Sequence, residues 1–375
     1  MDQSKIWRHF DFTLLGAVTL LIILGIAMIR STTLTSIDPA VQQYTSRQII
    51  YALVGAGILV VVSAIDYRLW SSIASGIYAV LIGLLLVVEA IGLTTFGATR
   101  WIDLGIVRLQ PSELGKFLIA LTLGHMIASN SEQMGRFNFV IKTLVHLGVP
   151  IFLIFIEPDL STCVIYVVIW LAVMWAAGLR WQHLAVFGGV AVAVVPIGFL
   201  TILATPKLSY QADRIIHFLI PDKNSPTYQD AAYNVQQALI SIGSGGWFGQ
   251  GYGHGSQVQL RFLKVRHTDF IFSAISNEFG FIGAIVVILL LAFVIYRIFR
   301  AGQLARDSFG SLICYGIGAL ILYQSFFNIG MNMNLLPVTG LPLPFVSYGG
   351  SSLWTFLFGI GLVESVILRH KQIEF

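Results

Sequence analysis

Charged residues are rare in this sequence, and a few stand inside or beside long apolar stretches. Glu113 and Lys116 lie three residues apart, directly after Pro111. Pro111 suits the first turn of a helix, and the spacing puts both charges on one helix face. Charged side chains in apolar helices usually mark a pathway or a binding site. The alternative interpretation is an ion pair that only fixes helix packing.

Two aspartates stand where apolar runs begin. Asp159, in Glu157-Pro158-Asp159, separates two such runs, because the proline ends one helix just before the next. It would hold a cation or ligand, or else cap the second helix. Asp269 follows Thr268 where a long polar stretch meets an apolar run. Its carboxylate is expected in the first helical turn, as a cap or as a general base for a hydroxyl group.

Three arginines, Arg47, Arg108 and Arg214, flank the ends of predicted helices. A guanidinium at such a position suits the grip of phosphate or diphosphate oxygens, or else anchors a helix among lipid headgroups. The glycine-rich run from Gly243 to Gly255 lacks the Gly-Lys-Ser/Thr ending of a P-loop. Its backbone NH groups remain candidate anion donors.

The elements that position these residues are predicted to be membrane helices. The chain has 375 residues, of which 56% are hydrophobic and 11% charged, and a mean hydropathy of +0.82. A surface in water would be far more polar. Apolar runs long enough to cross a bilayer recur. Helices are predicted at about 12–29, 49–65, 72–92, 112–129, 143–157, 161–178, 183–204, 270–298, 309–331 and 351–368. The fold class is therefore an all-α integral membrane protein: one polytopic domain, residues 1–375, of about ten transmembrane helices.

The distribution of basic residues predicts that both termini are cytoplasmic, because Lys and Arg concentrate in the segments on that side. The long stretch between helices seven and eight, about 205–268, then forms a folded extracytoplasmic element. A second outer segment, about 334–350, is apolar but too rich in proline for a helix, so it is expected to fold back and line a cavity. Both cysteines lie in apolar runs, which gives no support to a disulfide or metal site.

Several ordered motifs together make the sequence similar to the SEDS family (shape, elongation, division and sporulation) over nearly the whole chain. Asn328-Ile329-Gly330-Met331 and the short termini resemble the elongation members more than the division members. The motifs are Leu109-Gln110-Pro111-Ser112-Glu113-Leu114-Gly115-Lys116, Glu157-Pro158-Asp159-Leu160, Ile242-Gly243-Ser244-Gly245-Gly246, His267-Thr268-Asp269-Phe270-Ile271-Phe272, Leu341-Pro342-Leu343-Pro344 and Ser347-Tyr348-Gly349-Gly350-Ser351-Ser352.

The resemblance implies a peptidoglycan glycosyltransferase that polymerises lipid II at the outer face of the cytoplasmic membrane for cell elongation and shape. Asp269 then matches a catalytic aspartate, the candidate base for the acceptor hydroxyl. The other matched positions would line the substrate cavity or meet the lipid diphosphate: Glu113, Lys116, Asp159, Arg47, Arg108, Arg214 and Ser347. No cofactor or metal ligand is evident, and a divalent cation, Mg²⁺ or Mn²⁺, is left unassigned.

The implied partners are lipid II, glycan linked to undecaprenyl diphosphate, a class B penicillin-binding protein and the elongation machinery. No basic run interleaved with aromatic residues predicts nucleic-acid binding. A lipid II flippase, a division-type member and a noncatalytic scaffold remain as alternatives. A flippase has no need of a base in an outer loop, so Asp269 favours polymerisation.

The sequence departs from the family pattern at a few positions, and most of these concern backbone freedom more than chemistry. The departures are Lys264-Val265 in place of Pro-Glu before the Asp269 motif, Ser161, Ala232 and Asn334 in place of glycine, and Asn277 in place of an acid.

Overall fold

The computed structural model describes residues 9–36, 38–95, 98–103, 108–183, 226–263 and 265–370, and residues 185, 189 and 218 singly. The predicted helix at 183–204, Arg214 and Lys264 lie largely or wholly outside this part of the chain. The described elements, in order, are α2 (Phe12–Thr33), α3 (Pro39–Gln42), α4 (Tyr44–Ala64), α5 (Tyr67–Ser72), α6 (Ala74–Ile91), β1 (Leu93–Thr95), β2 (Ala98–Asp103), β3 (Arg108–Leu109), α7 (Pro111–Ala128), the 3₁₀ turn η2 (Ser131–Gln133), α8 (Phe137–Ile156), α9 (Leu160–Ala176), α12 (Pro226–Gly245), α13 (Ser256–Gln259), α14 (Ile271–Leu304), α15 (Ser308–Asn332) and α16 (Gly350–Leu368).

The polytopic helical fold is confirmed. Within the described residues, 6 helical stretches are long and apolar enough to cross a membrane, and α6 and α9 are apolar but shorter. Each predicted helix in this part of the chain has a counterpart, although α8 begins at 137 rather than 143 and α14 continues to 304 rather than 298. Both extensions carry polar or basic residues that project beyond the apolar span, where water satisfies them.

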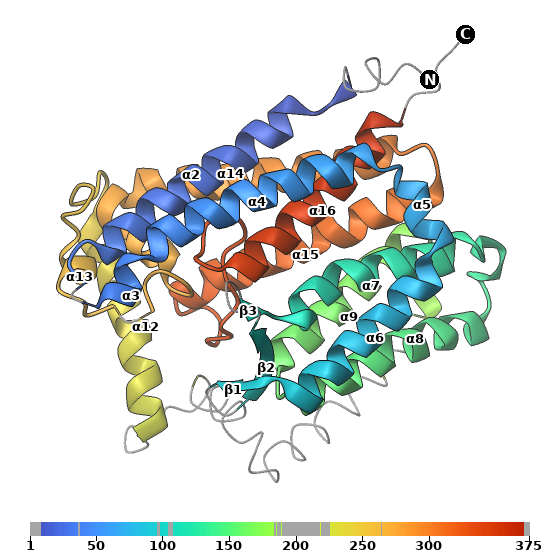
Figure 1. Cartoon of the computed structure of the whole chain (residues 1–375), viewed down its shortest axis with the longest axis horizontal. Helices are drawn as coiled ribbons and strands as arrows, with labels where there is room; N and C mark the ends of the chain where they lie inside the picture. Colours follow the sequence, from blue (N-terminus) through green and yellow to red (C-terminus); the bar gives the residue numbers. More distant parts are fainter. Residues whose placement is uncertain are drawn as a thin grey trace.

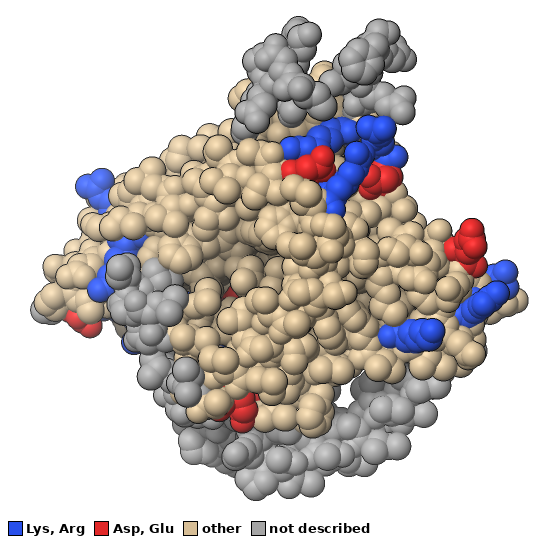
Figure 2. Space-filling model, turned by 45° about the vertical axis from the view of Figure 1, so that its right-hand side comes forward, with Lys and Arg blue, Asp and Glu red and all other residues tan. Residues whose placement is uncertain are grey.

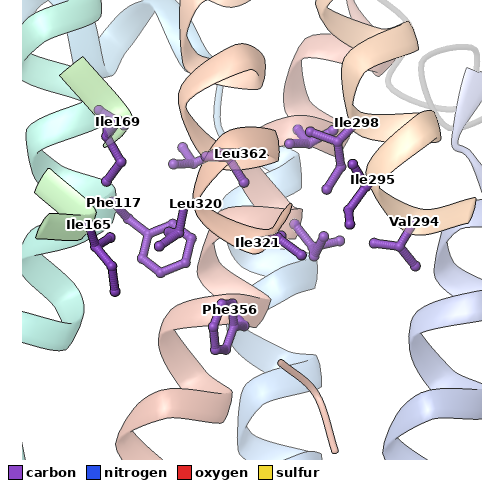
Figure 3. Packing of buried hydrophobic residues seen from close by; sticks show 14 of the residues in the cluster. Phe117, Ile165, Ile169, Val294, Ile295, Ile298, Leu320, Ile321, Phe356 and Leu362 are labelled. Carbon is purple, nitrogen blue, oxygen red and sulfur yellow. The ribbon is translucent and has the colours of Figure 1, made fainter. Parts of the chain in front are cut away.

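The helices form two groups joined through a central core. Figure 1 shows α16 between α4 and α15, with α2 and α14 along one side and α6, α7, α8 and α9 on the other. In Figure 3, buried side chains from α7, α9, α14, α15 and α16 meet at the centre. Phe117 of α7 meets Phe356 of α16 edge to face, with 5.8 Å between ring centroids. The start of α2 and the end of α16 lie at one end of the bundle, and α3, α12 and α13 lie at the opposite end (Figure 1).

The surface agrees with a membrane location. Figure 2 shows charged side chains gathered toward the edges of one face, with a broad uncharged area between them and a hollow near its middle. Large apolar side chains such as Leu53 and Phe152 are exposed on the outside of the bundle. Such exposure suits contact with lipid rather than water.

The longest helix, α14, is broken at Gly280, which has a φ of 67°. A glycine-rich segment, residues 245–255, packs its backbone into this break. Phe281 N donates to Gly246 O (2.8 Å), and Gly251 N donates to Glu278 O (3.0 Å). A Cβ at Gly249 would lie 2.1 Å from Glu278 O. The glycines therefore allow close backbone approach. Because Gly251 N is used in this way, the predicted role of this run as a set of anion donors is not supported there.

A small antiparallel sheet, in the order β1-β2-β3, precedes α7 and was not predicted. Ile102 of β2 pairs with Leu109 of β3. The predicted irregular segment, residues 333–349, lies between α15 and α16 and is called the proline segment below. Its second half, residues 341–349, is buried or half-buried, as expected for apolar backbone that is not helical, whereas residues 333–335 and 340 are exposed.

Candidate functional site

The turn that carries Asp269, residues 265–270, is fixed by backbone contacts to the proline segment. Ser347 Oγ donates to Thr268 O (2.8 Å) and accepts from Leu343 N (2.8 Å). Tyr348 N donates to His267 O (2.9 Å). The predicted cavity residue Ser347 is therefore close to Asp269 in space, and its buried hydroxyl joins the two segments.

Asp269 lies just before the first turn of its helix, whereas the sequence predicted its carboxylate within that turn. The helix α14 begins at Ile271, its N-cap residue is Phe270, and no side chain at that position makes a capping hydrogen bond. Asp269 precedes the cap. Its backbone carbonyl accepts hydrogen bonds from Asn328 Nδ2 (3.0 Å) and Asn332 Nδ2 (2.9 Å), both from α15.

These two asparagines belong to a row of buried amides on one face of α15. Gln324, Asn328 and Asn332 follow each other at intervals of four residues, and each is 0% exposed. We call them the amide ladder. Asn328 Nδ2 also donates to Leu341 O (2.7 Å), and Gln324 Nε2 donates to Pro342 O (3.1 Å). The ladder thus fixes both the proline segment and the Asp269 turn.

The predicted pair Glu113 and Lys116 reaches the same ladder from α7. Lys116 Nζ lies 2.6 Å from Glu113 Oε1, and the two side chains are 0% and 8% exposed. Lys116 Nζ also donates to Gln324 Oε1 (3.3 Å). The second carboxylate oxygen, Glu113 Oε2, is buried without a hydrogen-bond partner. The pair is thus linked through Gln324 to the segment that holds the Asp269 turn.

Asp159 caps α9, which was the alternative interpretation of this residue. Its carboxylate accepts from Thr162 N (3.2 Å) and Thr162 Oγ1 (3.0 Å). Gln110 Nε2 donates to Asp159 Oδ2 (3.3 Å), and Gln110 N donates to Ser351 Oγ (3.2 Å). Asp159 is therefore joined to the starts of α7 and α16, but the structure shows it as a structural acceptor.

The turn before Asp159 is held by an arginine that was not among the predicted site residues. Arg100 of β2 donates from Nε to Glu157 O (2.9 Å) and from Nη2 to Pro158 O. Burial, with the neighbouring Asp159 charge, raises the pKa of Glu157 to about 8. The unpredicted sheet thus has a role: it brings Arg100 to this turn.

Two predicted arginines are exposed, and both lie near the Asp269 turn or the start of α16. Arg47 is in the first turn of α4 and donates to Gln43 Oε1 (3.1 Å). Tyr44 is the first residue of the same helix. Its ring stacks on that of Tyr348, with 4.4 Å between ring centroids, and meets the ring of His267 at 5.0 Å. Arg108 is an exposed residue of β3, two positions before Gln110. The third, Arg214, lies outside the described residues.

The rings of Tyr44, His267 and Tyr348 form an aromatic cluster, in which His267 is the side chain whose ordinary pKa lies closest to neutral pH. Its ring also meets Tyr348 edge to face, with 5.8 Å between centroids. Burial, assisted by the positive charge of the adjacent Arg266, lowers the pKa of His267 to about 4. The ring is therefore neutral at physiological pH. Sequence reasoning quoted His267 only as part of a motif.

Three departures from the family pattern can be followed in the structure: Ser161, Asn334 and Asn277. Ser161 Oγ donates to Thr339 O (3.0 Å), which adds a bond between α9 and the proline segment. Asn334 has a φ of 56°, a conformation that asparagine tolerates better than most residues and that glycine adopts freely. A third, Asn277, donates to Ser244 Oγ (2.8 Å), which an ionised acid at this position would not do.

Comparison with known proteins agrees with this architecture. Residues 12–372 match the sequence model of the family FTSW_RODA_SPOVE, described as cell cycle protein. The chain is 34% identical to peptidoglycan glycosyltransferase MrdB of Escherichia coli strain K12, covering 100% of this chain and 99% of the relative.

Solved structures resemble the whole chain as well. One, described as the structural coordination of polymerization and crosslinking by a peptidoglycan synthase complex, has a TM-score of 0.81, 25% identity and coverage of 97% and 99%. The rod shape determining protein RodA of Thermus thermophilus has a TM-score of 0.71, 26% identity and coverage of 98% and 99%. With its family model matched from residue 12 to 372, this chain belongs to the FtsW, RodA and SpoVE family, the SEDS proteins.

Proposed function

We propose that this protein is a peptidoglycan glycosyltransferase that polymerises lipid II into glycan strands for cell elongation and shape. The observation that carries the proposal is the construction around Asp269. Buried hydroxyl and amide groups from two other segments fix the backbone of its turn on both sides. A general base needs such a fixed position to meet its substrate proton. The name of the relative MrdB points to the same activity, and the name of RodA points to a role in rod shape.

The reaction would use the groups as follows. The Asp269 carboxylate takes the proton of an acceptor sugar hydroxyl, whose oxygen forms a bond to the anomeric carbon of the donor. The bond from that carbon to the diphosphate breaks, and the lipid diphosphate leaves. Positive side chains stabilise the charge that develops on the leaving group. Arg47 and Arg108 are the exposed candidates for this contact.

The placement of the site agrees with chemistry on the outer side of the cytoplasmic membrane. The start of α2 and the end of α16 lie together at the end of the bundle opposite to α12 and α13 (Figure 1). We propose that this end is cytoplasmic, as the positive-inside pattern predicts. Asp269 then faces the outside, where a lipid-linked donor already carries its leaving group. No nucleotide is required, and an assay with chelator, Mg²⁺ or Mn²⁺ tests whether a divalent cation assists.

We also propose a class B penicillin-binding protein as partner, in an assembly with the elongation machinery. The described residues belong to the membrane bundle and to the segments at its ends, and we assign peptide cross-linking to the partner. The structural relative described as a peptidoglycan synthase complex couples polymerisation with crosslinking. The choice of elongation over division rests on the Asn328-Ile329-Gly330-Met331 motif.

The test is a polymerisation assay with purified protein and lipid II, with and without the partner. Asp269→Asn keeps the shape of the side chain but removes the base, so polymer formation should fall by about 10²- to 10⁴-fold. Asp38→Asn is the matched control: Asp38 is an exposed outer carboxylate that caps α3, and asparagine caps equally well. Full activity of Asp269→Asn would contradict the assignment. Lipid II transfer between leaflets without polymer, in the parent protein, would favour a flippase.

A further inference from the structure

The start of α14 is capped from another helix. An α-helix leaves its first NH groups without partners inside the helix, and a side chain at the N-cap position usually accepts from one of them. Phe270 offers no such group. Instead, Asn332 Oδ1, at the end of α15, accepts from Ser273 N (3.1 Å) and from Ser273 Oγ (2.6 Å). Asn332 therefore does for α14 what a local cap residue normally does.

The side-chain nitrogen of Asn332 makes a hydrogen bond to the backbone of Asp269. Asn332 Nδ2 donates to Asp269 O (2.9 Å) and to Asn328 O (2.8 Å). Asn332 is 0% exposed, so no water competes for these bonds. One rigid amide thus spans from the backbone carbonyl of Asp269 to the backbone NH of Ser273, four residues later, and fixes how the chain enters α14.

This arrangement bears on what the Asp269 carboxylate can do. An aspartate next to a helix start commonly becomes its cap, and its carboxylate is then stabilised by backbone NH groups and is a weaker base. Here the acceptor for Ser273 N comes from α15. The NH group of Ser273 therefore has its acceptor on another helix and does not depend on a local cap residue.

We propose that Asn332 is a positioning residue for Asp269: it caps the start of α14 and holds the backbone carbonyl of Asp269, which sets the direction in which the chain enters the helix. This inference rests on the proposed function of Asp269 as the base. It differs from a packing role, because it assigns separate tasks to the two ends of one amide. The oxygen caps the helix, and the nitrogen holds the carbonyl of Asp269.

Two variants separate these tasks. Asn332→Ala removes both, whereas Asn332→Asp keeps an acceptor for Ser273 N but loses the donor to Asp269 O. Asn334→Gly is the matched control: it removes an exposed amide from the same helix end, at a φ of 56° that glycine adopts without strain. Steady-state polymerisation of lipid II is measured for each folded variant, as kcat and KM across pH. Hydrogen–deuterium exchange reports on the first turn of α14.

In the alanine variant, kcat should fall by about 10- to 100-fold with little change in KM, because a misplaced base costs rate rather than substrate binding. The acid limb of its pH profile should shift, and exchange at Ser273 should become faster. The aspartate variant should keep slow exchange at Ser273 yet still lose kcat. The control should match the parent in all three measurements.

An unchanged kcat in a folded Asn332→Ala protein, or a loss confined to KM, would overturn the positioning role. Unchanged exchange at Ser273 would overturn the capping role. If Asn332→Ala does not fold, Asn332→Asp still tests the hold on Asp269 O, because it keeps an acceptor for Ser273 N. A parent protein that makes no polymer refutes the proposed function instead, and the exchange measurement still decides whether Asn332 caps α14.

Discussion

Replacing Lys116 by methionine is the sharpest test of the buried charges in this protein. Methionine has a similar volume and flexibility but no charge. Lys116 is 0% exposed and its partner Glu113 is 8% exposed. The substitution therefore leaves a carboxylate in the bundle without its counter-ion, while Gln324 Oε1 loses a donor.

The expected loss of stability follows from these contacts. Removing one partner of a buried ion pair costs about 3–5 kcal/mol, because the remaining charge is uncompensated. Glu113 Oε2 already lacks a hydrogen-bond partner, so no neighbouring donor is in place to replace the lysine. We expect the free energy of unfolding to fall by about 4 kcal/mol. The exposed Lys142, on α8, gives the control Lys142→Met, which should change it by less than about 0.5 kcal/mol.

The double variant Glu113→Gln with Lys116→Met separates structure from function. It removes both charges, so most of the stability should return. Unfolding of purified protein in mixed micelles measures this, and lipid II polymerisation is assayed on the same samples. Recovered stability without recovered activity would show that the pair acts in the site. Recovery of both would leave it a packing device. A loss below about 1 kcal/mol in Lys116→Met would refute the reasoning from burial.

Two further predictions concern the Asp269 turn. The pKa of His267 is about 4 in the folded protein, against 6.5 in the unfolded chain, so below pH 6.5 the unfolded state takes up the proton first. Stability should fall between about pH 6.5 and 4 by up to about 3 kcal/mol, and in His267→Gln this part of the pH dependence should be absent; equal slopes in both proteins would contradict it. Ser347→Ala should cost about 1–3 kcal/mol, because buried Leu343 N and Thr268 O both lose a partner, with Ser352→Ala as control and chemical unfolding as the measurement. No difference between the two serine variants would argue against the link.

The sequence predicts this fold well, because the length and polarity of apolar runs are local properties. The positions of α15 and α16 follow directly from such runs. The ion pair Glu113–Lys116 also follows from spacing, since residues three apart share a helix face. The broken helix α14 does not: one apolar run contains it, and only the backbone of residues 245–255 reveals the break at Gly280.

The candidate site is less predictable, because its contacts join segments far apart in the chain. The amide ladder had a sequence signal, three amides at intervals of four in an apolar helix, but their targets are backbone carbonyls that no side-chain pattern specifies. Arg100 likewise acts through the carbonyls of Glu157 and Pro158. Asp269 was found through its motif, but no local pattern relates it to Asn332, which accepts from Ser273 N and lies 63 residues away from Asp269.

The break in α14 also bears on how the protein is made. At Gly280 the backbone of the 34-residue helix leaves the helical conformation, so the neighbouring carbonyl and NH groups lose their partners within the helix. Lipid offers them no replacement. Their partners, residues 246–251, come earlier in the chain. During synthesis the glycine-rich segment therefore emerges before the helix it completes. Insertion of α14 into the bilayer can then proceed with its missing hydrogen bonds already supplied, and a variant that blocks this docking should accumulate as a stalled, protease-sensitive assembly intermediate.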